Sequence, residues 1–256
     1  MKWPNCLVLI RHDVSSYNVL KKEKEADPLY RTFGELFISD PDGKETKRLA
    51  LLLWKKYQLN CSDAKTPLID PKAKQAHRTG QRMKKELVLP DVIFVSPYRR
   101  AMDTLEGLRQ GWPELAKVKC YEEERIREQE HGLALLYNDW RIFQVLHPEQ
   151  RFLYEQEGMY RYRYPQGESV PDVRDRSLLM MNTIIRDWAG KNVMLVCHHL
   201  NILALRANLD RLREKEFIRL DKEEKPINCG VTVYRGHPKL GQDGRLVLEF
   251  YNKKYY

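Results

Sequence analysis

The stretch Leu7-Val8-Leu9-Ile10-Arg11-His12-Asp13 is an apolar run of strand length that ends abruptly in a cation and an imidazole. Short uninterrupted apolar runs are typical of strands buried on both faces of a parallel sheet. In open α/β sheets, ligands bind at the carboxyl ends of such strands. We therefore predict a buried first strand with Arg11 and His12 at its functional end.

Two later stretches repeat this plan. Asp91-Val92-Ile93-Phe94-Val95-Ser96 is followed by a helix that opens near Arg99, and Asn192-Val193-Met194-Leu195-Val196-Cys197 ends in His198-His199 before another helix. Strands that alternate with helices favour parallel pairing with helices on both faces of the sheet. The predicted fold class is α/β, a three-layer sandwich with a mainly parallel central sheet flanked by helices.

The length of 256 residues, of which 42% are hydrophobic, allows one large core. We predict a single domain over residues 1–256 with insertions at about 20–60 and 133–165. Residues 44–58 within the first insertion have helical spacing. The second insertion is rich in aromatic and basic groups with little periodicity, and we interpret it as a lid-like excursion. Residues 209–225 are expected to form a charged, solvated helix.

The charge balance is basic, with 45 Lys and Arg against 36 Asp and Glu, a net charge of +9. Such a balance favours anionic partners, without choosing among phosphoesters, nucleic acid and membrane surfaces. The five cysteines are widely spread with no C-x-x-C pair, so neither a disulfide framework nor a zinc ribbon is indicated. No signal peptide or membrane span is recognised, and we expect a cytoplasmic protein without a membrane partner.

Three predicted strand ends carry polar groups of one kind: Arg11 and His12, then Arg100, then His198-His199. Because parallel strands end at the same edge of a sheet, these side chains should converge on one pocket. Arginine presents a rigid fork of donors that matches phosphate oxygens, and each helix that starts after a strand adds backbone amides. The sequence therefore predicts a phosphate site.

An imidazole in such a pocket can act as a nucleophile, and we assign this role to His12. The arginines would neutralise charge on the transferred phosphoryl group. A carboxyl group must protonate the leaving oxygen. Our candidate is Glu128 in the run Arg125-Ile126-Arg127-Glu128-Gln129-Glu130, where Glu130 is the nearest competitor.

These segments resemble the motifs of the histidine phosphatase superfamily, the phosphoglycerate mutase-like enzymes. Arg11-His12-Asp13-Val14-Ser15-Ser16-Tyr17-Asn18 is similar to the family's Arg-His-Gly-x-Ser-x-x-Asn, and Ser96-Pro97-Tyr98-Arg99-Arg100-Ala101-Met102-Asp103-Thr104 to its Ser-Pro-x-x-Arg-Ala-x-x-Thr. Arg127-Glu128-Gln129-Glu130-His131-Gly132 resembles the segment with the acid, and Val196-Cys197-His198-His199 resembles the second-histidine motif. Four motifs in order are a specific signal.

The resemblance implies a mainly parallel sheet between helices and no metal or organic cofactor. It places the catalytic roles on His12, Glu128 and His198, and phosphate binding on Arg11, Asn18, Arg100 and His199. Asn18 is equally explained as a helix cap. The implied activity is hydrolysis of phosphate monoesters of small metabolites through a phosphohistidine on His12.

Two departures leave alternatives open. Asp13 stands where the family has glycine, and its carboxylate could repel a phosphate or tilt His12, which would give a weak enzyme or a phosphate-binding pseudoenzyme. Cys197 and His199 replace the commoner residues around His198. A mutase that returns the phosphoryl group to its substrate is the alternative within the family.

Other classes of function are also open. A metal site made of Cys197, His198, His199 and His12 lacks the usual ligand spacing. Basic charge alone does not make nucleic acid an expected partner, and homodimerisation is left open. The expected partner is a small phosphorylated substrate, which the sequence does not specify.

Overall fold

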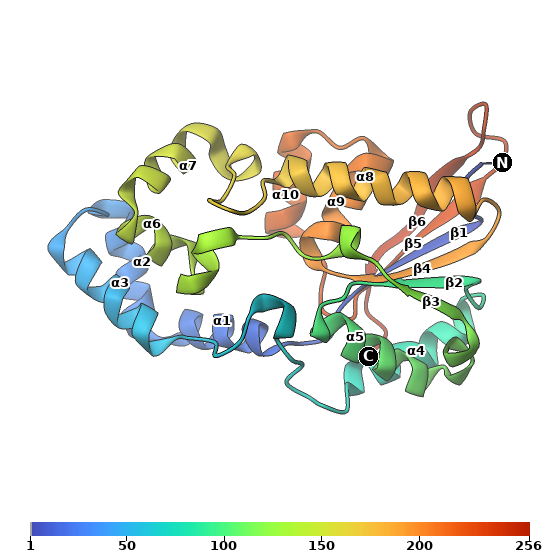
Figure 1. The fold of residues 1–256 in the computed structure, drawn as a ribbon, viewed down its shortest axis with the longest axis horizontal. Helices are drawn as coiled ribbons and strands as arrows, with labels where there is room; N and C mark the ends of the chain where they lie inside the picture. Colours follow the sequence, from blue (N-terminus) through green and yellow to red (C-terminus); the bar gives the residue numbers. More distant parts are fainter. Residues whose placement is uncertain (1) are drawn as a thin grey trace. The chain divides into compact units, whose positions relative to one another are not determined.

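The computed structural model describes residues 2–256 (Figure 1), and these form two compact units. The first unit comprises residues 2–15, Ala64–Glu128 and Asp172–Tyr256, and the second comprises Ser16–Asp63 and Gln129–Pro171. The second unit contains the two stretches that we assigned to insertions. The assignment of the whole chain to a single domain stays a prediction.

The first unit is built on a six-stranded sheet in the order β3-β2-β4-β1-β5-β6. β1, β2, β3 and β4 run parallel to one another, whereas β5 runs antiparallel to both β1 and β6. The mainly parallel sheet confirms the predicted α/β class. The strands are β1 (Cys6–Arg11), β2 (Val92–Val95), β3 (Lys119–Glu122), β4 (Asn192–Cys197), β5 (Val231–His237) and β6 (Arg245–Lys253).

Helices cover both faces of this sheet (Figure 1). On one face, Val8 and Ile10 of β1 share a core cluster with Met83 of α4. On the other, Leu7 and Leu9 share a cluster with helices α8 and α9. Both faces of β1 are buried, which explains why its sequence is uninterrupted rather than alternating. The helices of this unit are α4 (Lys74–Glu86), α5 (Arg99–Gly111), α8 (Val170–Asp187), which begins in the second unit, α9 (His199–Asp210) and α10 (Glu214–Glu223).

The strand register decides which residues meet at the functional edge. Arg11 lies opposite Cys197, and Val95 lies opposite Val196. The residues that follow these strands, His12, Ser96 and His198, therefore emerge at the same edge of the sheet.

The second unit is helical, and its core joins Phe33, Leu49, Leu53, Ile142 and Val145. Our interpretation of residues 133–165 as an excursion did not anticipate its helices, because they are short and Gly158 at φ 71° interrupts the last one. The helices of this unit are α1 (Ser16–Ala26), α2 (Pro28–Ser39), α3 (Lys44–Lys56), α6 (Trp140–Leu146) and α7 (Pro148–Arg161).

The expected helix over residues 209–225 is divided in two. Arg211 adopts a left-handed conformation at φ 57° and ends α9, and α10 begins three residues later. Short 3-10 turns complete the chain: η1 (Asp63–Lys65), η2 (Pro113–Lys117), η3 (Glu124–Ile126) and η4 (Gly132–Tyr137). Across residues 2–256, no helix combines the length and the apolar character that crossing a membrane would require.

Candidate active site

The candidate site lies in the first unit, where β1, β2 and β4 end. The backbone N–H of His12 donates to the carbonyl of Cys197 at 3.0 Å, and that of Ser96 donates to the carbonyl of Val196 at 3.0 Å. These bonds continue the sheet one residue past the strands, so the side chains after the strands are held rigidly. The rings of His12 and His198 come together with centroids 5.2 Å apart.

His12 is held in one tautomer. Its Nδ1 lies 2.6 Å from the carbonyl oxygen of Asp13, which can only accept a hydrogen bond, so Nδ1 carries the proton. Burial lowers the pKa of His12 well below its usual value, and the charges of Arg100 and Arg11 lower it further. A neutral imidazole protonated on Nδ1 leaves the lone pair on Nε2, the form that a nitrogen nucleophile requires.

His198 is fully buried at the position that precedes α9. Its Nε2 is 2.7 Å from the hydroxyl of Ser96, and its ring meets that of Tyr98 edge-on at 5.1 Å. Burial also lowers its pKa well below the usual value, helped by the charge of Arg100. Within residues 2–256, Nδ1 of His198 is buried with no hydrogen-bond partner. A buried ring nitrogen without a protein partner is available for a hydrogen bond to a bound ligand.

Two guanidinium groups add positive charge to this edge. Arg11 donates from Nη1 to the carbonyl of Pro226 at 2.6 Å, and burial lowers its pKa. Arg100 is buried in the first turn of α5, with its guanidinium carbon 4.9 Å from the centre of the Tyr98 ring. Both charges act on His12 and on His198. Together with the neutral imidazoles, they make an environment that favours an anion.

The carboxyl group of Glu128 reaches the same place from another segment. Its Oε1 accepts a hydrogen bond from the backbone N–H of Leu200 at 3.1 Å, in the first turn of α9. Its charge acts on Arg11 and His199. Arg176 of α8 fixes the segment, because its guanidinium donates to the carbonyls of Arg125, Arg127 and Glu128 at 2.8, 2.8 and 3.0 Å.

The carboxylate of Asp13 is bonded to the protein backbone. Oδ1 accepts from the N–H of Val14 at 2.7 Å, and Oδ2 accepts from the N–H of Ala76 at 3.1 Å. Ala76 is in the first turn of α4, where N–H groups have no partner within the helix. The backbone N–H of Asp13 donates to Thr104 at 2.8 Å, and burial raises the pKa of its carboxyl. The side chain thus caps α4 while its carbonyl orients His12.

The structure brings together Arg11, His12, Arg100, Glu128 and His198 at one edge of the sheet. The side chain of His199 instead has Nε2 2.6 Å from Asp221 of α10, and burial lowers its pKa against the pull of that carboxylate. Asn18 belongs to α1 in the second unit, and its role stays a prediction.

A metal centre at this site receives no support from the arrangement of side chains. Among residues 2–256, no group of three or more His, Cys, Asp or Glu side chains is placed to hold a metal ion.

Sequence reasoning gave no role to Ser96, Arg176 and Asn228. Asn228 donates from Nδ2 to the carbonyls of His12 and Asp13 at 2.9 and 3.2 Å, and so supports the loop that carries the imidazole. Ser96 begins the motif that contains Arg100, and its position directly after a predicted strand could have identified it as a site residue. Arg176 and Asn228 sit in a helix and a turn with no local pattern, because their partners are distant in sequence.

A sequence model of the histidine phosphatase superfamily (branch 1) matches residues 53–242, more than half of the 256-residue chain. The chain belongs to the histidine phosphatase superfamily. The matched range includes Arg100, Glu128 and His198, while His12 precedes it.

Two curated relatives of this histidine phosphatase superfamily chain show how far the likeness extends. A phosphoglycerate mutase-like protein of Arabidopsis thaliana is 30% identical over 135 residues, covering 49% of this chain and 46% of the relative. A 2,3-bisphosphoglycerate-dependent phosphoglycerate mutase of Nocardia farcinica is 26% identical over 180 residues, covering 60% and 71%. The chain thus spans less than half of the length of the Arabidopsis relative.

Solved structures of the superfamily share the fold over nearly the whole chain. A mycobacterial glucosyl-3-phosphoglycerate phosphatase, solved with inorganic phosphate, has a TM-score of 0.63 at 19% identity and covers 98% of each chain. The predicted membership in this superfamily and the predicted phosphoglycerate mutase-like fold are confirmed.

Proposed function

We propose that this member of the histidine phosphatase superfamily hydrolyses phosphate monoesters of small metabolites through a phosphohistidine on His12. The observation that carries the proposal is the tautomer of His12. Its Nδ1 donates to the carbonyl of Asp13, and its pKa is lowered by burial and by the charges of two arginines, so Nε2 offers a lone pair close to two cations. The neighbouring Asp13 does not argue for a pseudoenzyme, because both of its carboxylate oxygens are engaged with backbone N–H groups.

In the first step, Nε2 of His12 attacks phosphorus, forming the N–P bond as the P–O bond to the leaving group breaks. Glu128, as the acid, gives its proton to the leaving oxygen. Arg11, Arg100 and Nδ1–H of His198 stabilise the charge of the phosphoryl oxygens. In the second step, water attacks phosphorus, its proton returns to Glu128, and the N–P bond breaks to release inorganic phosphate.

The test is the variant His12→Ala assayed with a generic aryl phosphate. We expect turnover to fall by about a thousandfold or more, because no other residue supplies the nucleophile. The control is His237→Asn, which removes an exposed histidine at the end of β5 and should leave turnover unchanged. Full activity of His12→Ala, with a native circular dichroism spectrum, would refute the proposal.

The second candidate is phosphoryl transfer of the mutase type, which the names of the relatives in Arabidopsis and Nocardia favour. A mutase must keep water from the phosphoenzyme, whereas a phosphatase must admit it. With 3-phosphoglycerate as the substrate, a phosphatase releases inorganic phosphate and a mutase forms the isomer with the phosphate retained. The ratio of the two products distinguishes the candidates.

We also propose the cytoplasm as the compartment. None of the five cysteines, all within residues 2–256, forms a disulfide, and Cys6, Cys197 and Cys229 are buried as thiols. A reducing environment preserves such thiols. The substrate class remains small phosphorylated metabolites, and a screen of such compounds with wild type and His12→Ala would identify the substrate.

A further inference from the structure

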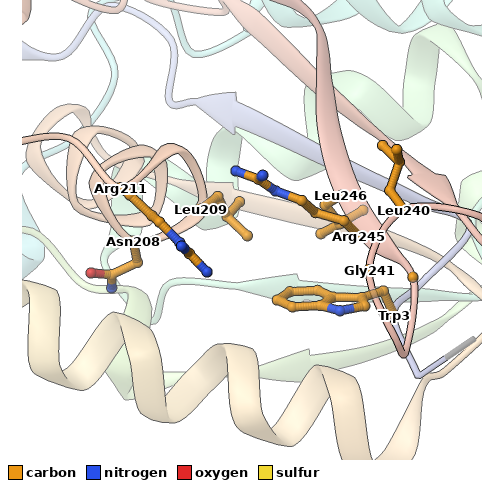
Figure 2. A pocket seen from close by; sticks show the side chains of 9 residues that line it. Trp3, Asn208, Leu209, Arg211, Leu240, Gly241, Arg245 and Leu246 are labelled. Carbon is orange, nitrogen blue, oxygen red and sulfur yellow. The ribbon is translucent and has the colours of Figure 1, made fainter.

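A pocket lies in the first unit, at the edge where the parallel strands begin (Figure 2). It has a volume of about 440 Å³, within the range of small-molecule sites. Trp3 precedes β1, Arg245 begins β6, and Arg211 ends α9. His198 precedes the opposite end of α9, whose 12 residues span about 18 Å. This pocket is therefore separate from the candidate active site.

Two arginines give the pocket a positive charge that the protein does not neutralise. In Figure 2 the side chain of Arg211 runs toward the indole of Trp3, and that of Arg245 runs toward Arg211. None of the nine lining residues is acidic. Within residues 2–256, neither guanidinium has an ion-pair partner. Both side chains are exposed, and guanidinium groups that face one pocket attract an anion and can bind its oxygens.

The acidic residues next in sequence are already occupied. Asp210 accepts hydrogen bonds from Arg206 and from the hydroxyl of Tyr234, both at 3.0 Å. Asp243 pairs with Lys2 at 3.1 Å. Asp210 and Asp243 therefore pair with groups other than Arg211 and Arg245, whose guanidinium groups remain available to an anion from solution.

The rest of the pocket is lined mainly by apolar side chains, one of which is the planar indole of Trp3. Leu209 and Leu246 are buried beneath it, and the indole of Trp3 packs against the same core cluster. The side chain of Asn208, also in the lining, accepts a hydrogen bond from Nε of Arg174 at 3.1 Å and donates one to the backbone carbonyl of Arg174 at 2.8 Å. An indole held in place beside guanidinium groups suits a planar ring attached to an anion.

We propose that this pocket binds a small anionic molecule with a planar aromatic ring, of the class of the nucleoside monophosphates. The ring stacks on Trp3, and the anionic group lies between Arg211 and Arg245. The proposal does not depend on the activity of the candidate active site.

The experiment titrates adenosine 5′-monophosphate into the full chain carrying His12→Ala, by isothermal calorimetry, so that the probe is not consumed. A hydrogen bond from a charged arginine raises affinity by about tenfold. The double variant Arg211→Ala with Arg245→Ala should therefore raise the dissociation constant of the nucleotide by about a hundredfold. Trp3→Leu should weaken binding of the nucleotide but not of inorganic phosphate. In the otherwise wild-type chain, Arg211→Ala should leave aryl phosphate turnover unchanged.

The matched control is Arg82→Ala, which removes one exposed arginine of α4 in the same unit. This variant should bind the nucleotide as well as its parent. The proposal is overturned if the nucleotide does not bind, if the double variant binds as tightly as its parent, or if Arg82→Ala weakens binding as much as Arg211→Ala.

Discussion

His12 owes its chemical state to a backbone carbonyl and to its burial. The carbonyl of Asp13 fixes the proton on Nδ1, and burial beside Arg100 and Arg11 keeps the ring neutral by lowering its pKa. An isolated histidine would be partly protonated near neutrality and would exchange between tautomers. The surroundings of the ring thus leave the lone pair on Nε2, the form that the proposed nucleophile requires.

The role proposed for Glu128 can be tested by its dependence on the leaving group. Glu128→Gln keeps an acceptor for the N–H of Leu200 but has no proton to give. Turnover of an alkyl phosphate should fall by about 10²–10⁴-fold, the range of general acid catalysis. Turnover of dinitrophenyl phosphate should change little, because that leaving group departs without a proton. Glu130→Gln is the control and should leave turnover of both substrates unchanged. An equal loss of turnover with both substrates in Glu128→Gln would rule out the acid role.

Asp13 is predicted to act mainly on stability. Asp13→Gly leaves the N–H groups of Val14 and Ala76 without their acceptor, which should lower the free energy of unfolding by about 2 kcal/mol. The acceptor of the His12 proton is a backbone carbonyl and remains, so turnover should fall less than about tenfold. Urea denaturation measures the change in the free energy of unfolding. Asp70→Ala, which removes a half-buried carboxylate that accepts from the backbone N–H groups of Lys72 and Lys74, should cost less. A stability of Asp13→Gly equal to or greater than that of wild type would contradict the prediction.

At the level of helices, α4 and α5 pack closely because they meet at glycines. A Cβ on Gly80 would lie 2.4 Å from the carbonyl oxygen of Leu108, and a Cβ on Gly111 would lie 2.0 Å from that of His77. Backbone atoms cannot move aside as a side chain can. This close approach lets α4 and α5 pack together against the face of the sheet that carries Val8 and Ile10, and Arg100 lies in the first turn of α5.

Gly80→Ala should therefore destabilise the protein although alanine favours helices. The gain in helix propensity is about 1 kcal/mol, whereas overpacking costs about 1–3 kcal/mol and is severe here because the contact is with backbone. We expect a net loss of about 1–2 kcal/mol in urea denaturation. Gly34→Ala in α2 is the matched control, since its Cβ would meet only the end of the Arg141 side chain at 3.3 Å. A stabilised Gly80→Ala would show that the helices can separate without cost.

For the molecule as a whole, two buried neutral imidazoles make stability depend on pH. The pKa values of His12 and His198 are lowered in the folded state, so the unfolded chain binds more protons below about pH 6.5. Their contribution to stability is present above that pH and is lost as the pH falls. Between pH 7.5 and 5.5 the loss should be about 1.4 kcal/mol for each imidazole.

Urea denaturation at the two pH values measures this effect. The variant His12→Gln keeps only one of the two imidazoles. Between pH 7.5 and 5.5, its free energy of unfolding should therefore fall by about 1.4 kcal/mol less than that of wild type. An identical pH dependence of wild type and variant would contradict the prediction.

The sequence by itself determined the parallel sheet and the residues at the ends of its strands, because apolar runs and the polar residues after them are local patterns. Arg11, His12, Arg100 and His198 were chosen as candidates for the same reason, whereas Glu128 was chosen from a charged run and from the resemblance to a family motif. Only the tertiary structure decided that Arg176 and Asn228 support the site, that His199 faces Asp221 and that Asp13 caps α4. These contacts join residues far apart in sequence, and the packing of helices on the sheet, which no local pattern encodes, selects them.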